Sequence, residues 1–125
     1  MTKAACFYQF WSQFGLNAYE ENEVPTGADA PEFPYITYEL VTDRWLNTTA
    51  MSASLWYRGD SWKPANAKAD EIAKYINLGG VALMCDEGGI LVRMGSPFAQ
   101  NMGDNSDEDI KRKVINITAE FLTAH

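Results

Sequence analysis

Apolar residues recur at helical spacing in two parts of the chain. The first set lies on one face of a helix predicted over residues 3–14, and it consists of Phe7, Phe10, Trp11 and Phe14. A second helix is predicted to open at Pro64 and to end at Gly79, with Ile72 and Ile76 on its apolar face. Each helix therefore needs an apolar surface to pack against.

Alternation of apolar and polar residues predicts strands elsewhere. Five are expected, over residues 35–40, 49–59 and 110–124 and on either side of a tight turn within residues 81–95. The strand residues expected to face the core are Ile36, Tyr38, Leu40, Met51, Leu55, Ile115, Ile117 and Phe121. Residues 16–34 and 96–109 follow neither period, and both are predicted to be long irregular loops.

The order of these elements predicts an α+β fold. The helices are few and the strands come in groups, which favours a mostly antiparallel sheet of about five strands with the two helices packed on one face. Residues 1–125 are expected to form a single domain, because 125 residues with 46% hydrophobic content are enough for one core. The other face of such a sheet is left bare.

Large apolar residues that this arrangement leaves unassigned are candidates for contact with another chain. Tyr35 and Trp56 are expected on or near the bare face, and Trp62 lies in a connection. Phe98 and Met102 lie in the second predicted loop, where they either fold back over the sheet or contact a neighbour. Packing within the chain is the alternative for Trp56 and Trp62.

The charge of the chain limits its partners. The formal net charge is −7, and the ten lysines and arginines are scattered, so no surface that wraps nucleic acid is expected. No stretch approaches the length of a membrane span, and the start of the chain has no secretory signal. We therefore expect a soluble protein that stays in the compartment where it was made.

Residues suited to catalysis or metal binding are scarce. The one histidine is His125, the final residue, and the acidic run Asp104–Asp109 lacks the glycine that a calcium loop needs at its sixth position. Cys6 and Cys85 have no metal-ligand spacing and are predicted to be buried free thiols. The sequence thus predicts no catalytic, metal or cofactor site and no enzyme activity.

The ordered set of elements resembles a known family. An aromatic first helix, an acidic loop ending in "VPTGADAPEFPYITYEL", the strand "SASLWYRG", the helix "ANAKADEIAKYI", a hairpin bounded by glycines and the closing strand "VINITAEFLTA" are similar to the tail-terminator and tail-completion proteins of long-tailed bacteriophages. The similarity extends from about residue 5 to residue 124. The first helix departs from many members in being unusually aromatic.

The resemblance implies a structural role in a phage or prophage particle. A protein of this family would form a hexameric ring with copies of itself, contact the tail-tube protein and the head–tail connector protein, and reside in the virion tail after assembly in the bacterial cytoplasm. The alternatives are a head-closure or other minor virion component, and a non-enzymatic module that binds a peptide or small molecule on its aromatic sheet face.

Overall fold

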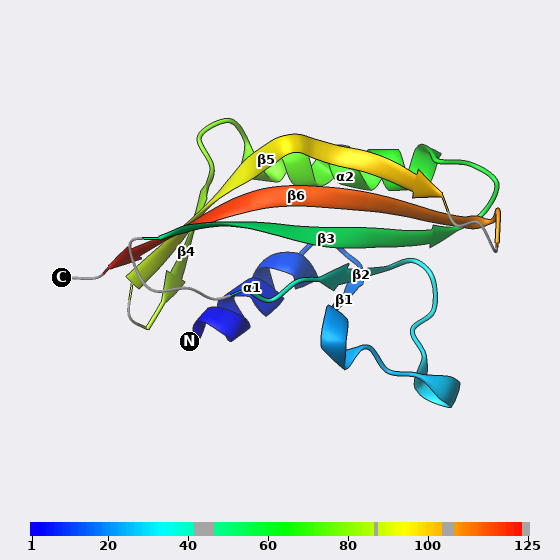
Figure 1. The fold of residues 1–125 in the computed structure, drawn as a ribbon, viewed down its shortest axis with the longest axis horizontal. Helices are drawn as coiled ribbons and strands as arrows, with labels where there is room; N and C mark the ends of the chain where they lie inside the picture. The colour runs from blue at the N-terminus through cyan, green and yellow to red at the C-terminus, as the bar shows by residue number, and fades with distance from the viewer. Residues whose placement is uncertain (42–46, 87, 104–106, 124–125) are drawn as a thin grey trace.

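The computed structural model describes residues 1–41, 47–86, 88–103 and 107–123. Within them the chain forms two α-helices, two short 3₁₀ helices and six strands (Figure 1). Their order is α1 (Lys3–Ser12), β1 (Asn17–Glu20), η1 (Glu21–Glu23), η2 (Gly27–Asp29), β2 (Tyr35–Tyr38), β3 (Thr48–Arg58), α2 (Lys63–Ile76), β4 (Val81–Cys85), β5 (Gly88–Gly103) and β6 (Ile110–Thr123). Both predicted helices are present, so the α+β class is confirmed.

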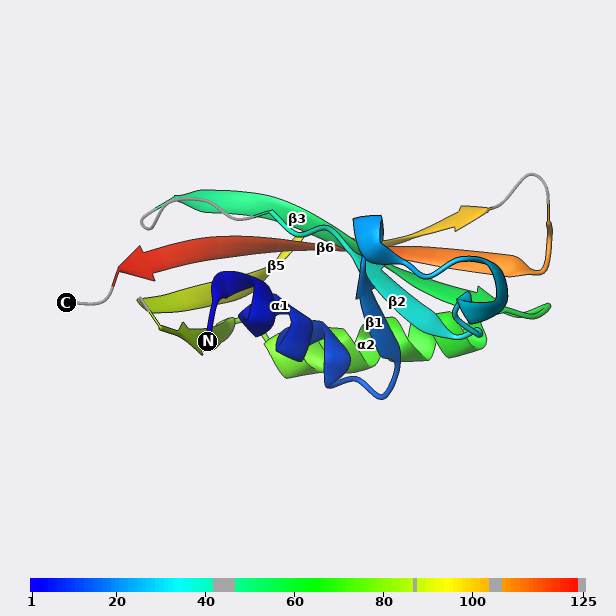
Figure 2. The same ribbon diagram turned by 90° about the horizontal axis from the view of Figure 1, so that it is seen from below.

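The molecule has two layers, with both α-helices on the same side of the sheet (Figure 2). The core lies between the layers, where Phe7 of α1 contacts Phe121 of β6 and Trp11 stacks on Tyr38 of β2. The residues predicted for the core that are buried are Phe7, Phe10, Trp11, Phe14, Ile36, Tyr38, Met51, Leu55, Ile72, Ile76, Ile115, Ile117 and Phe121. Leu40, also predicted for the core, is half-buried and packs against this cluster. No helix in the described part of the chain is long and apolar enough to cross a membrane.

Local signals explain where the two helices begin and end. The hydroxyl of Thr2 accepts a hydrogen bond of 3.1 Å from the backbone N–H of Ala5 and caps α1. Pro64 lies in the first turn of α2, where its missing N–H costs nothing. After α2 the chain passes close to β5 at Gly80, which has φ +85°, and a Cβ there would lie 2.8 Å from the carbonyl oxygen of Val92. Glycine is therefore required at that position.

The sheet is mixed and has six strands in the order β1-β2-β3-β6-β5-β4. The prediction of a mostly antiparallel sheet of about five strands is confirmed for the pairs β2–β3, β3–β6, β6–β5 and β5–β4, which are antiparallel, but it misses β1, a sixth strand that pairs parallel to β2, with Asn17 opposite Tyr35. The predicted loop 16–34 thus contains a strand. β1 has four residues, and because only Ala18 among them is buried, its sequence shows no alternation. Its partner strand, β2, lies more than ten residues further along the chain. Only the folded arrangement makes β1 a strand.

The second predicted loop is also mostly strand. β5 continues to Gly103, and its pairing with β6 shifts between Met94 and Ala99, so that residues 95–98 bulge from the sheet. The glycine, serine and proline in this stretch break the alternation of the sequence, so the pattern alone predicts that the strand ends before them. The amide of Asn116 in β6 donates a 2.9 Å hydrogen bond to the carbonyl of Pro97 and holds the bulge. Residues 104–106 of the acidic run, like His125, lie outside the described residues.

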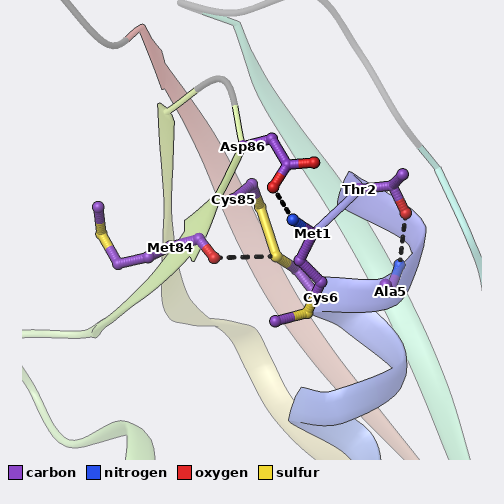
Figure 3. The surroundings of a disulfide bond; sticks show 7 residues. All are labelled: Met1, Thr2, Ala5, Cys6, Met84, Cys85 and Asp86. Atoms are coloured by element: carbon purple, nitrogen blue, oxygen red, sulfur yellow. Dashed lines mark hydrogen bonds and ion pairs between the residues drawn. A yellow bond between two sulfur atoms is a disulfide. The ribbon is translucent and has the colours of Figure 1, made fainter.

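Cys6 and Cys85 are joined by a disulfide, which corrects the prediction of two free thiols (Figure 3). The bond connects α1 to the end of β4 across 79 positions of sequence. Beside it the amino group of Met1 forms an ion pair with Asp86, whose backbone N–H donates to the Met1 carbonyl at 2.9 Å. The spacing of two cysteines in a sequence carries no information about this proximity, which arises because α1 packs next to β4.

Reduction of this disulfide is expected to lower the free energy of unfolding by about 2–4 kcal/mol, because the reduced unfolded chain gains the freedom that the long closed loop denied it. The measurement is thermal or urea unfolding with and without a phosphine reductant. A Cys6→Ser/Cys85→Ser double variant provides the control, since its stability should match that of the reduced protein and should not respond to reductant. Equal stability of the untreated and reduced proteins would contradict the bond.

Candidate interface on the uncovered face of the sheet

The face of the sheet opposite the helices, called here the open face, carries a cluster of aromatic and arginine side chains. Cross-strand pairing places Tyr35 of β2 beside Trp56 of β3, and Trp56 beside Arg112 of β6. Phe33 precedes β2 and Arg58 ends β3. These five residues, Phe33, Tyr35, Trp56, Arg58 and Arg112, are referred to below as the aromatic–arginine cluster.

The rings and cations of the cluster are stacked. The Tyr35 and Trp56 rings lie 6.1 Å apart between centroids, with only 15° between their planes. The guanidinium carbon of Arg112 lies 4.9 Å from the Trp56 ring centroid, and that of Arg58 lies 5.1 Å from the Phe33 ring centroid. Such cation–π contacts keep each arginine extended along an aromatic surface with part of its guanidinium available to a partner.

Hydrogen bonds hold two members of the cluster in place. The indole N–H of Trp56 donates to the hydroxyl of Thr37 at 2.8 Å, and Nε of Arg112 donates to the hydroxyl of Ser54 at 2.9 Å. Ser54 is 5% exposed, so its hydroxyl is buried under the arginine that it accepts from. Side chains ordered in this way lose little conformational entropy when a partner binds.

Arginines and lysines are separated between the two sides of the molecule. Three of the four arginines, Arg58, Arg93 and Arg112, lie on the open face, and Arg44 lies outside the described residues. The lysines belong to the helices or to the helix-covered face of β6, and they are Lys3, Lys63, Lys68, Lys74, Lys111 and Lys113. Interfaces between proteins are enriched in arginine, tryptophan, tyrosine and methionine and depleted in lysine. The part of the open face around the aromatic–arginine cluster has this composition.

The structure brings three of the five candidate interface residues together. Tyr35 and Trp56 are in the aromatic–arginine cluster, and Met102 of β5 pairs with Arg112 beside it and is 41% exposed. Trp62 lies on the other side of the sheet, at the start of α2, with the amine of Lys111 5.9 Å from its ring centroid. Phe98 lies in the bulge of β5 and packs against the core.

Sequence reasoning missed Phe33, Arg58 and Arg112 as candidates. Strand alternation gives a signal for Arg58 and Arg112. Positions 56 and 58 share one face of the first strand, and positions 110 and 112 share one face of the second. Which strands are neighbours was needed to bring them together. Phe33 stands in the stretch that the sequence predicted as a loop, and only its contact with Tyr35, at 5.3 Å between ring centroids, places it in the cluster.

A hollow of about 400 Å³ lies on the open face beside the bulge. It is lined by polar side chains such as Ser52 and Thr118 and by apolar ones such as Met51. The carboxylate of Glu39 at its rim accepts hydrogen bonds from the backbone N–H and the hydroxyl of Ser52, at 2.7 and 2.8 Å. Among the described residues, no group of three or more histidine, cysteine or acidic side chains is arranged to hold a metal ion.

Burial in the cluster changes the acidity of Tyr35. Its pKa is raised above the usual 10.0, first by desolvation and then by the nearby Tyr19. The pKa values of Tyr38 and Tyr57 are also raised, with burial as the main cause. All three phenols are therefore held in their neutral form.

The free energy of unfolding is expected to fall above pH 10. Below that pH the tyrosines are protonated in both states, but as the pH rises from 10 through the raised folded pKa values the unfolded chain loses these protons first, which favours unfolding. Urea unfolding at about pH 9 and about pH 11 measures the change. Tyr35→Phe should show a smaller drop than the unaltered protein, and an equal drop would mean that Tyr35 does not contribute.

Comparison with known proteins identifies the fold but no family. No protein-family model matches the sequence, and no curated protein matches it. One solved structure, whose name states no activity, is similar with a TM-score of 0.65 at 12% sequence identity, covering 98% of this chain and 94% of the other. Similarity at this level of identity shows a shared fold alone.

Proposed function

We propose that this protein is a structural component of a phage or prophage tail, a tail terminator that caps the tail tube as a hexameric ring and joins it to the head connector. The observation that carries the proposal is the open face, where Tyr35, Trp56 and Met102 lie beside arginines and no helix among the described residues covers them. The hexameric ring on the tail tube is suggested by the resemblance to tail-terminator proteins in the order of the sequence elements.

Ring formation agrees with the way the surface is divided. A rotational ring needs two different surfaces on each copy that fit one another head to tail. In this fold the helices cover one face of the sheet, so the open face and the sheet edges remain for neighbours. At roughly 25 cal/mol per Å², a few hundred Å² of buried apolar surface contributes about 5–10 kcal/mol per contact before association entropy is subtracted.

The acidic charge suits a ring through which DNA passes. With a net charge of −7 on each copy, a channel wall repels the phosphate backbone and lets DNA slide without adhering. The same repulsion acts between copies and opposes assembly. The contacts between copies must therefore offset it.

Deletion of the gene in a particle-producing strain tests the role. Electron microscopy is expected to show filled heads without tails beside tail tubes of excessive length, because nothing stops tube growth or joins the tube to the connector. A plasmid copy of the gene should restore normal particles. Tubes of normal length joined to no head would favour the head-closure alternative, and unchanged particles would exclude both roles.

A binding module is the second candidate, favoured by the hollow of about 400 Å³ on the open face. Its lining combines polar side chains with Ala50, Met51 and Ile117, which would suit a peptide or a small molecule with polar and apolar parts. Such a module acts as a monomer or dimer, so light scattering over a range of concentrations separates the two candidates. A strict monomer that also fails to assemble on purified tail tubes would favour the module.

A further inference from the structure

A groove follows the outer edge of β4, which is the last strand on its side of the sheet. The groove has a volume of about 330 Å³ and lies between β4 and α1, with Tyr75 of α2 beside them. Ala82, Leu83 and Met84 all line it. Because side chains alternate between the two faces of a strand, a hollow that contacts three consecutive residues runs along the edge of the strand.

The backbone of β4 presents hydrogen-bonding groups to this groove. In an antiparallel ladder the N–H and C=O of one residue point to the same side, and successive residues point to opposite sides. The carbonyl oxygen of Met84 points away from β5, 3.3 Å from Sγ of Cys6 (Figure 3), and the N–H of Asp86 donates to the carbonyl of Met1. Ala82 therefore also points outward. Its N–H and C=O and the N–H of Met84 have no partner in the described part of the chain.

The two edges of the sheet differ in how they are protected from pairing. β1, at the opposite edge, has four residues and ends in the charged Glu20. β4 consists of Val81–Cys85, which are all apolar, and Met84 is 72% exposed. Charged side chains and proline are common means of keeping an edge strand from pairing with another chain. β4 has neither, so its outer edge is open to an added strand.

The wall of the groove opposite β4 suits the backbone and the apolar side chains of a peptide. Gln9 of α1 is exposed, and its amide can donate and accept hydrogen bonds. Phe10 and Tyr75, whose ring centroids lie 6.3 Å apart, give an apolar surface beside it. No acidic or basic side chain of the described residues lines the groove. A charged segment would therefore find no partner for its charges there.

The groove is closed at one end. Met1 and Cys6 line it there, the disulfide to Cys85 ties α1 to β4, and the carbonyl of Met1 is bonded to the chain just after β4 (Figure 3). The β4 strand of a second copy fits this groove poorly, because it lies between α2 and β5 and its chain would have to continue past Met1. A flexible segment can end or turn away at that point.

We propose that an extended, uncharged segment of a partner protein binds in this groove as an additional strand on β4. The backbone of the segment exchanges hydrogen bonds with Ala82, and one of its carbonyls accepts from the N–H of Met84. Alternate side chains of the segment then lie over Phe10 and Tyr75, so apolar residues are favoured at every second position. The groove lies away from the open face, and the proposal is independent of the tail role.

Titration with a short capped peptide of alternating threonine and valine, followed by amide NMR, tests the proposal. Up to about 5 mM peptide, the largest shifts are expected at the amides of Ala82 and Met84, with a Kd of about 1 mM or below. The control is the same peptide with methyl groups on its backbone nitrogens. It keeps the side chains but cannot donate hydrogen bonds, so its binding should be weaker by about tenfold or more.

Two variants of the protein locate the binding. Ala82→Pro removes an N–H that faces the groove and leaves the bonds of Leu83 to β5, and Tyr75→Asp places a charge in the groove. Each is expected to weaken peptide binding by about tenfold. The matched control is Tyr8→Asp, since Tyr8 is a similarly exposed tyrosine on α1 outside the groove. If Ala82→Pro does not fold, the comparison of Tyr75→Asp with Tyr8→Asp still decides.

Three results would overturn the proposal. They are an absence of binding up to about 5 mM peptide, equal binding of the methylated peptide, and shifts confined to residues of the open face. Sedimentation of the unaltered protein and of Ala82→Pro gives a further test. If the unaltered protein self-associates and Ala82→Pro does not, a second copy occupies the edge and the proposed partner segment is excluded. The gene-deletion experiment is unaffected by any of these outcomes.

Discussion

Replacing Ile72 with aspartate is expected to leave the chain unfolded at room temperature. Ile72 is fully buried on the face of α2 that packs against the sheet. A carboxylate at that position must either stay charged without a partner or take up a proton, and it also leaves a cavity where the isoleucine was. The expected loss exceeds about 5 kcal/mol, which is comparable with the whole stability of a domain of this size.

Far-UV circular dichroism and a proton NMR spectrum of the Ile72→Asp variant measure the effect. Ala67→Asp in the same helix is the control, because Ala67 is exposed and its replacement introduces the same charged residue, with a cost in helix propensity of at most about 0.7 kcal/mol. We expect the free energy of unfolding of Ala67→Asp to lie within about 1 kcal/mol of that of the unaltered protein. A folded Ile72→Asp variant of normal stability would mean that α2 does not cover the sheet.

Aspartate at Phe98 and at Met102 is expected to have opposite effects, although both residues belong to β5 and were proposed together as interface residues. Phe98 packs against the core from the bulge, so Phe98→Asp should lower the free energy of unfolding by about 2–4 kcal/mol. Met102 is exposed beside Arg112 on the open face, so Met102→Asp should change stability by no more than about 0.5 kcal/mol.

The same two variants differ in what they do to assembly. Met102→Asp places a charged carboxylate beside Arg112 on the open face, where contact with a neighbouring copy would remove it from water, so a folded monomer that no longer self-associates is expected. Urea unfolding and light scattering on each variant give the two readings. Loss of folding in Met102→Asp would show that this end of β5 belongs to the core, and unchanged assembly would place the contact elsewhere.

Periodic segments of the sequence could be predicted with little ambiguity. The stripe of Phe7, Phe10 and Phe14 predicts α1, and alternation in β3 and β6 predicts which residues face the core. These predictions work because burial repeats with the period of the element, so the pattern is written in consecutive residues. Exposed carboxylates with no apolar surroundings could likewise be recognised as surface charge.

Elements that depend on a distant partner could not be predicted in this way. β1 is four residues long and buries only Ala18, so its identity comes from pairing with β2. β5 runs through a glycine, a serine and a proline because β6 supplies hydrogen-bonding partners on both sides of the bulge. Cys6 and Cys85 carry no signal of their pairing, which follows from the packing of α1 next to β4.

By itself the sequence determined the α+β class, the two helices and most of the core. It also contains more aromatic residues than the packing of the helices on the sheet requires. Only the tertiary structure decided that Tyr35, Trp56 and Arg112 become neighbours, because that depends on the order of strands β2, β3 and β6 in the sheet. Strand order is set by long-range hydrogen bonding and packing between segments far apart in the chain. A surface assembled from alternate residues of three strands therefore exists only in the folded protein.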